Sequence, residues 1–390
     1  MPVVNQNTSE SHPDNFFPDQ TFYLACLNGD LDQVERSLAE GVNVNAVMTA
    51  DFTALMLASS GGHTDVVERL INAGANLDAA RSNGATALFI AAEYGNTDCL
   101  KRLINAGADL NARNEGGATP LFVAAAKDNT DCVELLINAG VDVNTALTDG
   151  ATPVLIAAQK NNTECLQLLI NAGADLNAAL LDGATPLFIA AQQNNIECVQ
   201  LLINAGVNLN ARAEDGATPL LIAAQKNNTE CVQRLINAGA DLNAALLNGA
   251  TPLFIAALKG NTDCVQRLIN AGAALNARAE TDATPLHIAA ANGNTDVLKL
   301  LINAGAALNA RAKTDVTPLH VAAANGNTDV LKLLINAGAD LNAALLNGAT
   351  ALSIATEMGN TECAKLLINA EAEMGTEAEK ETKEKRHAVR

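Results

Sequence analysis

Residues 168–195 read LLINAGADLNAALLDGATPLFIAAQQNN, and most of this stretch returns at residues 235–261 as LINAGADLNAALLNGATPLFIAALKGN. The threonine of the ATPLF motif or its variants recurs every 33 residues without insertion or deletion, at Thr53, Thr86, Thr119, Thr152, Thr185, Thr218, Thr251, Thr284, Thr317 and Thr350. One further step back reaches a degraded copy near residue 20, so the sequence predicts eleven repeats. A strict period of this size is typical of a solenoid, because a single repeat cannot bury its apolar face alone.

Each repeat contains two short helical segments and an extended loop. In residues 185–194, Thr185 can cap a helix and Pro186 lies in its first turn, where a missing N–H costs nothing. Residues 261–272 carry apolar side chains at helical spacing and end in glycine. The loop that follows ends in Asp-Gly or Asn-Gly, which is typical of a hairpin turn. The pattern predicts an all-α repeat solenoid of helix-turn-helix repeats with β-hairpin loops.

The motifs TPLHIAA at residues 284–290 and TPLHVAA at residues 317–323, together with the 33-residue period, resemble the ankyrin repeat. The resemblance extends over residues 16–374. It implies an ankyrin stack in which the first helices form a palm, the β-hairpins form fingers, and a protein partner binds in the concave groove. The family favours histidine three residues after the marker threonine. Six repeats of this chain have an apolar residue there instead, which predicts apolar packing at the position: Phe89, Phe122, Leu155, Phe188, Leu221 and Phe254.

The ends of the chain differ in composition from the repeats. We predict a polar leader over residues 1–15, a single solenoid over residues 16–374 whose first and last repeats act as caps, and a charged tail over residues 375–390. The glutamate-rich tail resembles the C-terminal secretion signals of bacterial type IV effectors, many of which carry ankyrin arrays. A solvated end without a function is the alternative interpretation of the tail.

Charge and hydropathy exclude several classes of partner. The net charge is −19 and the isoelectric point is about 4.6, so phosphate backbones are repelled and nucleic-acid binding is not expected. The sequence lacks the layout of a signal peptide, and no apolar run approaches the roughly 18 residues that span a bilayer. We therefore expect a cytoplasmic monomer without membrane insertion. A bacterial effector would be translocated into the cytosol of its host.

The cysteines and histidines follow the repeat instead of forming a reactive cluster. Seven cysteines share one helical position that other repeats fill with valine: Cys99, Cys132, Cys165, Cys198, Cys231, Cys264 and Cys363. Stacked helices lie about 8–10 Å apart, which is too far for disulfides, so buried and reduced thiols are expected. His287 and His320 belong to the repeat motif. Metal-ligand spacing, phosphate loops and nucleophile motifs are lacking, and we predict no cofactor, no metal site and no enzymatic activity.

Two variable strips are candidates for partner binding. The palm strip, at the end of the first helices, holds Tyr94, Lys127, Lys160, Gln193, Lys226 and Lys259. Its basic row favours an acidic or polar peptide, and a solvated face without a partner is the alternative. The fingertip strip holds Arg113, Leu180, Leu181, Arg212, Leu246, Leu247 and Arg278. Its leucine pairs either pack between neighbouring loops or form an exposed docking surface.

The leading functional hypothesis is a non-enzymatic interaction scaffold that binds a protein or peptide. A targeting subunit of an enzyme complex is one alternative. A second is modification, because LINAGADLN at residues 169–177 and 235–243 resembles the sites of asparaginyl hydroxylases. The asparagines concerned are Asn111, Asn144, Asn177, Asn243 and Asn342. In the purely structural interpretation, these side chains hydrogen-bond the hairpin.

Overall fold

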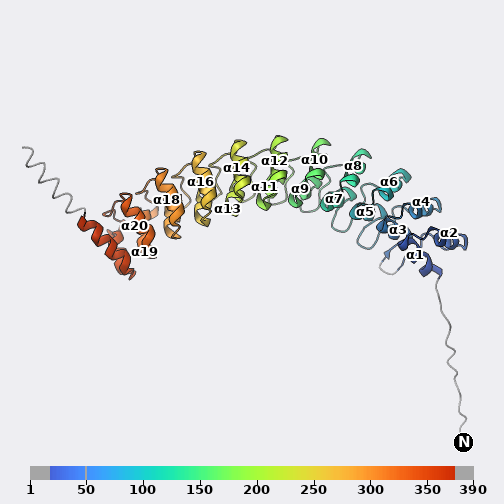
Figure 1. Cartoon of the computed structure of the whole chain (residues 1–390), viewed down its shortest axis with the longest axis horizontal. Coiled ribbons are helices and arrows are strands. Elements are labelled where there is room, and N and C mark those ends of the chain that lie inside the picture. Colours follow the sequence, from blue (N-terminus) through green and yellow to red (C-terminus); the bar gives the residue numbers. More distant parts are fainter. Residues whose placement is uncertain (1–17, 49–50, 374–390) are drawn as a thin grey trace, which may run out of the picture. The chain divides into compact units, whose positions relative to one another are not determined.

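The computed structural model describes residues 18–48 and 51–373, and their regular structure is helical (Figure 1). The chain separates into two compact parts, unit 1 over residues 1–175 and unit 2 over residues 176–390. Each unit contains a series of stacked helix pairs. The predicted leader and tail lie outside the described residues, and the continuity of residues 16–374 as a single solenoid stays a prediction.

The helices alternate as the repeat predicts. Those of unit 1 are α1 (Pro18–Asn28), α2 (Leu31–Ala39), α3 (Ala54–Gly61), α4 (Thr64–Asn72), α5 (Ala87–Tyr94), α6 (Thr97–Ala106), α7 (Pro120–Lys127), α8 (Thr130–Asn138), α9 (Pro153–Lys160) and α10 (Thr163–Asn171). Those of unit 2 are α11 (Pro186–Gln193), α12 (Ile196–Asn204), α13 (Pro219–Lys226), α14 (Thr229–Asn237), α15 (Pro252–Lys259), α16 (Thr262–Asn270), α17 (Pro285–Ala291), α18 (Thr295–Asn303), the 3-10 turn η2 (Lys313–Asp315), α19 (Pro318–Asn325), α20 (Thr328–Asn336), α21 (Ala351–Glu357) and a helix over residues 361–373. The odd-numbered α-helices after α1 directly follow a marker threonine.

The ends of α11 show how the local sequence sets the helix boundaries. The side-chain oxygen of Thr185 accepts a hydrogen bond from the backbone N–H of Phe188 at 3.3 Å, which satisfies one of the unpaired donors of the first turn. Pro186 occupies the first turn, as predicted. Asn194 ends the helix in the left-handed conformation, with φ 62°, which asparagine tolerates better than most residues.

Packing between successive odd-numbered helices of a unit makes most of the core. Leu187 and Ala190 of α11 are almost completely buried, as are Leu220 and Ala223 of α13. The even-numbered helices cover one side of this row with Cys, Val and Leu side chains. Aliphatic side chains and alanines thus bury the apolar face in thin layers, which accounts for the low aromatic content of the chain.

An asparagine directly before the second helix of a repeat binds the repeat that precedes it. Asn228 donates from Nδ2 to the carbonyl oxygens of Ala191 and Gln192, at 2.8 and 3.1 Å. These carbonyls belong to the last turn of α11, where a helix leaves acceptors without a partner. We call the set the asparagine ladder: Asn96, Asn129, Asn162, Asn228, Asn261, Asn294, Asn327 and Asn360. His63 takes this place in the first step, with Nε2 2.8 Å from the carbonyl oxygen of Leu27.

The cysteines within the described residues are buried and form no disulfide, as the sequence predicts. Some thiols are more than small apolar groups. Cys231 donates from Sγ to Oδ1 of Asn194 at 3.4 Å, and Cys264 donates to Oδ1 of Asn227 at 3.5 Å. Both acceptors end an odd-numbered helix in the left-handed conformation. Burial raises the pKa of Cys231 and Cys264 to about 11.

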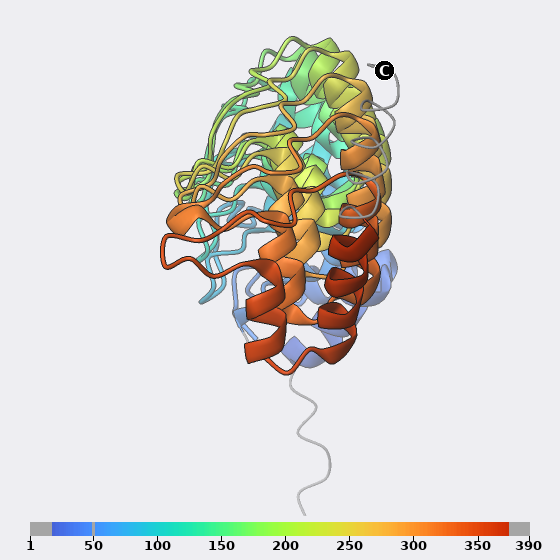
Figure 2. The same ribbon diagram turned by 90° about the vertical axis from the view of Figure 1, so that its left-hand side faces the viewer.

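The loops are tighter than the predicted β-hairpins. Before α11, the N–H of Leu180 donates to the carbonyl of Ala184 at 3.0 Å, and the N–H of Gly183 donates to the carbonyl of Leu180 at 2.9 Å. Gly183 has a φ of 82°, which completes a three-residue turn. Because Thr185 caps the next helix directly after the turn, the two sides of the loop are too short to pair as β-strands. The sole β-bridge in the described residues joins Ala344 to Thr350. Figure 2 shows the loops projecting to one side of the helices.

Candidate functional site

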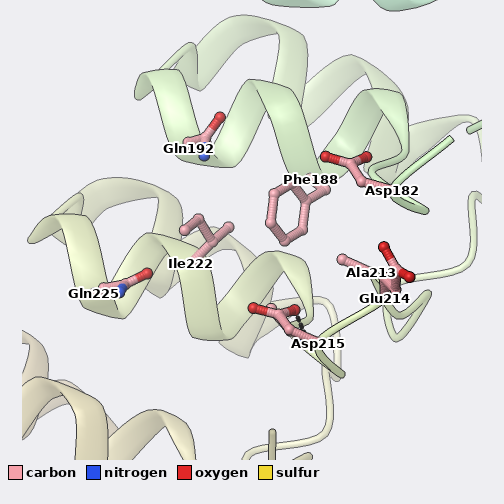
Figure 3. Close-up of a pocket in the computed structure, with 9 residues that line it drawn as sticks. Asp182, Phe188, Gln192, Ala213, Glu214, Asp215, Ile222 and Gln225 are labelled. Carbon is pink, nitrogen blue, oxygen red and sulfur yellow. Dashed lines mark hydrogen bonds between the residues drawn. The ribbon is translucent and has the colours of Figure 1, made fainter. Parts of the chain in front are cut away.

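A cavity of about 460 Å³ lies in unit 2, between α11 and α13 and the loops that precede them (Figure 3). We call it the α11–α13 groove. Its lining residues are Asp182, Phe188, Gln192, Ala213, Glu214, Asp215, Ala217, Ile222 and Gln225. The groove is therefore built from two successive repeats, with each repeat supplying part of its floor and part of its wall.

The floor of the groove is apolar and carries two glutamines. Phe188 and Ile222 are 8% and 6% exposed, so each presents only an edge of its side chain. Gln192 follows Phe188 by four residues and Gln225 follows Ile222 by three, which places each pair on one helix face. Within residues 176–373, neither glutamine side chain has a hydrogen-bond partner. Their donors and acceptors remain available to a bound chain.

The loop side of the groove carries three carboxylates. Asp182 accepts through Oδ1 from the N–H of Ala184 at 3.0 Å, and Asp215 accepts in the same way from Ala217 at 2.9 Å. Glu214 is exposed at the loop tip. None of the three carboxylates is within ion-pair distance of a cationic side chain in the described residues. This side of the groove therefore bears uncompensated negative charge.

The two leucines of each fingertip pair have different environments. Leu181 and Leu247 are 82% and 81% exposed, whereas Leu180 and Leu246 are half-buried. Burial therefore divides each pair: the first leucine is partly covered, and the second stands in solvent beside the α11–α13 groove or one loop further along. The docking role of the exposed leucines stays a prediction.

The palm residues are exposed, but those next to the groove do not line it. Lys226 and Lys259 end α13 and α15, and Gln193 ends α11. Gln193 and Lys226 each lie one position beyond a side chain that faces the groove, Gln192 and Gln225, whereas Lys259 belongs to α15, which does not line it. In unit 1, the other predicted palm residues, Tyr94, Lys127 and Lys160, are also exposed, Tyr94 at 63%. Nζ of Lys127 lies 4.0 Å from Oε1 of Glu93.

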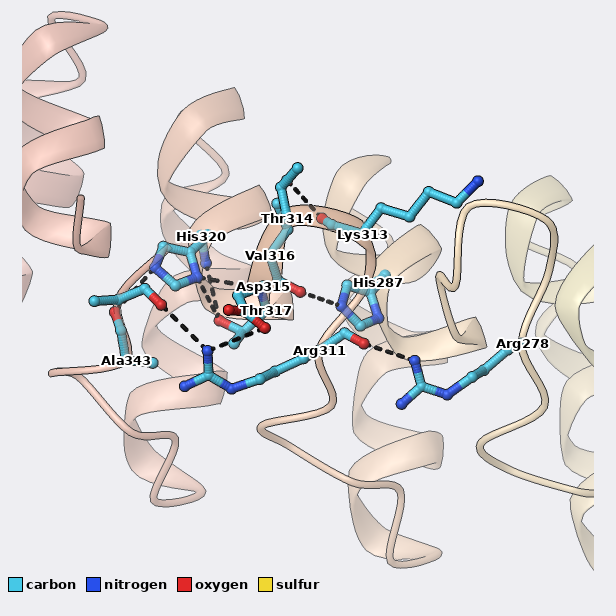
Figure 4. Close-up of polar contacts among 11 residues, drawn as sticks. Arg278, His287, Arg311, Lys313, Thr314, Asp315, Val316, Thr317, His320 and Ala343 are labelled. Atoms are coloured by element: carbon cyan, nitrogen blue, oxygen red, sulfur yellow. Dashed lines mark hydrogen bonds and ion pairs between the residues drawn. The ribbon is translucent and has the colours of Figure 1, made fainter. Parts of the chain in front are cut away.

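The fingertip arginines bind the main chain of the next loop. Arg212 donates from Nη1 to the carbonyl of Ala245 at 2.7 Å and to that of Gly216 at 3.3 Å. Arg113 makes the corresponding contact to Ala146 at 3.2 Å. Arg278 reaches the carbonyl of Arg311 at 2.6 Å (Figure 4). These bonds give the arginines a role in holding adjacent loops, and their predicted role in partner binding stays a prediction.

The two motif histidines are structural groups. Nδ1 of His287 accepts from the N–H of Thr284 at 3.2 Å, and Nε2 donates to the carbonyl of Val316 at 3.0 Å. His320 makes the same pair of bonds to Thr317 and Ala343 (Figure 4). Burial lowers the pKa of both imidazoles, which keeps them neutral. No group of metal-ligating side chains is present in residues 18–48 and 51–373.

Three of the asparagines predicted as modification sites, Asn144, Asn177 and Asn243, tie one loop to the next. Oδ1 of Asn144 accepts from the N–H of Asp175 at 2.8 Å, and Oδ1 of Asn243 accepts from that of Ala274 at 2.9 Å. For these three asparagines the structural interpretation needs correction, because Oδ1 accepts a hydrogen bond from the following repeat. The five predicted sites, Asn111, Asn144, Asn177, Asn243 and Asn342, have exposed side chains.

The carboxylates and the glutamines of the groove were not among the binding residues predicted from the sequence, although Gln192, Gln225 and Glu214 lie in the two variable strips. Glu214 lies two residues after Arg212, which was the residue predicted at this fingertip. Gln192 and Gln225 precede the palm residues that were favoured. Helical spacing could have identified the two glutamines. Gln192 lies four residues after Phe188 and Gln225 three residues after Ile222, so each shares a helix face with a residue of the groove floor.

Comparison with known proteins identifies the repeat. The model of the family described as "Ankyrin repeats (3 copies)" matches residues 22–114, 96–179, 156–245, 244–312 and 307–378. The crystal structure of the human ASB11 ankyrin repeat domain is 29% identical, covers 56% of this chain and 98% of its own, and has a TM-score of 0.52. Because 614 solved chains match, the likeness does not single out a partner. No curated protein matches in sequence.

No described helix is long and apolar enough to cross a bilayer. With matches along almost its whole described length, the chain belongs to the ankyrin repeat family, a family of protein–protein interaction modules.

Proposed function

We propose that this chain is a non-enzymatic scaffold that binds a protein or peptide partner through the α11–α13 groove and the neighbouring fingertips. One observation carries the proposal: the groove presents an apolar floor and two glutamine side chains that make no hydrogen bond within the described part of unit 2, beside the exposed Leu181. Contiguous features of this kind mark binding surfaces more often than they serve folding.

The exposed leucines supply the apolar part of the interface. Complete burial of a leucine side chain contributes about 1.5–3 kcal/mol, and Leu181 and Leu247 are each about four-fifths exposed before binding. Their loops are fixed to the neighbouring loops by main-chain hydrogen bonds, such as that from Leu247 N to Asp215 O at 3.0 Å. Little conformational freedom is therefore lost when a partner covers them.

The test is capture of a partner by two variants of the full chain. Leu181→Ser with Leu247→Ser removes both exposed leucines, and Ile368→Ser is the matched control, since Ile368 is an apolar side chain 54% exposed near the last described residues. Partners captured by the wild-type protein are identified by mass spectrometry, and their affinities for the variants are measured. We expect the leucine variant to lose capture and the control to retain it, with equal melting temperatures. Undiminished affinity of the leucine variant would refute the proposal.

The predicted palm residues of unit 1 are a second candidate binding surface. Tyr94 and Lys160 are exposed at the ends of α5 and α9, and Tyr94→Ala with Lys160→Ala tests them in the same capture assay. We further propose a cytoplasmic monomer, which light scattering after size-exclusion chromatography would test for oligomeric state.

The secretion hypothesis rests on the glutamates of residues 375–390 alone, which lie outside the described residues. Deleting them and measuring export in a type IV translocation assay tests it. Mass spectrometry after incubation with an asparaginyl hydroxylase tests the modification alternative, to which the exposed side chains of the five asparagines lend support.

A further inference from the structure

The α11–α13 groove combines an apolar floor with three carboxylates that have no cationic partner in the described part of unit 2. We propose that it receives a lysine or arginine side chain from an extended segment of the partner protein, with an apolar neighbour of that residue on Phe188 and Ile222. This inference rests on the proposed function and names the chemistry of the partner. The proposed basic side chain has the opposite charge to the acidic peptide that the palm lysines favour.

The carboxylates are not required by the turns that carry them. At the next loop of the stack, Leu247 and Asn248 stand where Glu214 and Asp215 stand. Asn248 accepts the same turn hydrogen bond through Oδ1, from the N–H of Ala250 at 3.1 Å. A neutral side chain therefore supports the turn equally well, and the negative charge is surplus to folding. Glu214 and Asp215 are the only adjacent carboxylates at these two positions among the loops of unit 2 before the odd-numbered helices.

The arrangement of side chains fits a cation at the loop side of the groove. Figure 3 shows the side chains of Asp182 and Asp215 on either side of the Phe188 ring. A guanidinium or ammonium group placed there would contact carboxylate oxygens and lie near an aromatic ring, and both contacts favour a cation. Gln192 and Gln225, on the helix side, can hydrogen-bond the peptide backbone of the partner segment.

The charge of the chain as a whole requires a matched control, because a net charge of −19 attracts basic peptides anywhere on the surface. The groove variant is Asp182→Asn with Glu214→Gln and Asp215→Asn. The outer-face variant is Glu197→Gln with Asp263→Asn and Asp329→Asn, which changes the net charge equally on the exposed first turns of α12, α16 and α20. Asparagine already occupies the Asp182 position at residues 83, 248 and 347 with the same turn bond, so the groove variant is expected to fold.

The probe is a displayed library of random peptides, selected on the immobilised full-length wild-type chain, the groove variant and the outer-face variant at physiological salt. We expect the wild-type chain and the outer-face variant to enrich peptides with lysine or arginine beside an apolar residue, and the groove variant to lose this enrichment. A synthetic copy of a selected peptide in which norleucine or citrulline replaces the basic residue should bind the wild-type chain about tenfold more weakly or worse.

Two outcomes overturn the inference in different ways. Selection of neutral or acidic peptides that depends on Leu181 and Leu247 would leave the proposed function standing and refute the cationic partner. Equal enrichment of basic peptides by the groove variant would refute the cationic site as well. No enrichment above the immobilisation support by any of the three proteins would refute both the inference and the proposed function.

Discussion

The backbone N–H of Glu214 donates a hydrogen bond of 2.7 Å to the carbonyl oxygen of Asp182, and this bond joins two successive loops. The same bond runs from Leu247 to Asp215 at 3.0 Å and from Glu280 to Asn248 at 2.7 Å. Because donor and acceptor are both main-chain atoms, the side chain at the donor position can be acidic or apolar without loss of the contact. The loop tips can therefore vary in chemistry while their spacing is kept.

The two leucines of a fingertip pair should differ in their effect on stability. Leu246→Ala removes a half-buried side chain and should lower the free energy of unfolding by about 1–2 kcal/mol, less than a fully buried leucine costs. Leu247→Ala removes a side chain that is 81% exposed and should change it by no more than about 0.5 kcal/mol. Urea denaturation of the two variants checks the order, and equal losses would show that the second leucine also packs.

Arg212→Ala should weaken the contact between adjacent loops. It removes the bonds from Nη1 to the carbonyls of Ala245 and Gly216, and their exposure limits the expected loss to about 1 kcal/mol. Amide hydrogen exchange should accelerate in the loop over residues 245–249, while the helix α16 is unaffected. Arg102→Ala is the control, since its only described contact is an exposed ion pair of 3.3 Å to Glu68. Unchanged exchange at residues 245–249 would contradict the role given to Arg212.

Asn261→Asp should be strongly destabilising. The amide of Asn261 donates to the carbonyls of Ala224 and Gln225 at 2.7 and 3.2 Å, and a carboxylate would place negative oxygens against both acceptors. Loss of the two bonds with added repulsion should cost about 2–4 kcal/mol. Asn204→Asp is the matched control at the exposed end of α12, where the side chain only accepts, from Gln200. Thermal denaturation of the two variants is the measurement. Similar melting temperatures would show that the hydrogen bonds of the asparagine ladder do not stabilise the fold.

Stability should decrease as the pH falls from about 7 to about 5. Burial lowers the pKa of His287 and His320 from 6.5, so the unfolded chain binds more protons than the folded chain below that pH. The stability contributed by the neutral imidazoles is complete above 6.5 and is lost as the pH falls through the folded-state pKa values. The double variant His287→Leu/His320→Leu, with the leucine that Leu155 and Leu221 place at this position, should show a flatter profile of melting temperature against pH. A profile as steep as that of the wild-type chain would assign the dependence to carboxylates.

The thiols should resist alkylation in the folded chain. Burial raises the pKa of Cys26 and Cys165 to about 12, so almost none of either side chain is thiolate at neutral pH. Treatment with iodoacetamide followed by mass spectrometry should label none of the cysteines quickly under native conditions and all eight in denaturant. Rapid native labelling of Cys231 or Cys264 would show that their helices open readily.

The sequence predicted the helices well because their determinants are local. Thr185, Pro186 and Asn194 cap and end α11 through contacts within a few residues, and these follow from residue type alone. The predicted β-hairpins are tight turns with little strand pairing, because a helix cap follows each turn immediately. The cap position was known, but its effect on strand length depends on the path of the chain in space.

The groove was less predictable because its residues come from two repeats. Asp182 and Glu214 are 32 residues apart and meet only when the loops stack. The role of Arg212 was also hidden, since its acceptors are carbonyl groups that every residue carries. The exposure of Leu247 beside the partial burial of Leu246 depends on the twist of a single turn, which sequence patterns do not specify.

Several of the hydrogen bonds that join successive repeats end on main-chain atoms. The amide of Asn228 meets two carbonyls, Oδ1 of Asn243 meets an N–H, and the guanidinium of Arg212 meets carbonyls. A newly inserted or exchanged repeat would offer the same main-chain acceptors and donors even where its fingertip side chains differ. Because the core residues also recur every 33 residues, recombination between copies of this sequence can lengthen the array or shuffle its fingertips while the core packing is kept, so new surfaces can arise in whole steps of 33 residues.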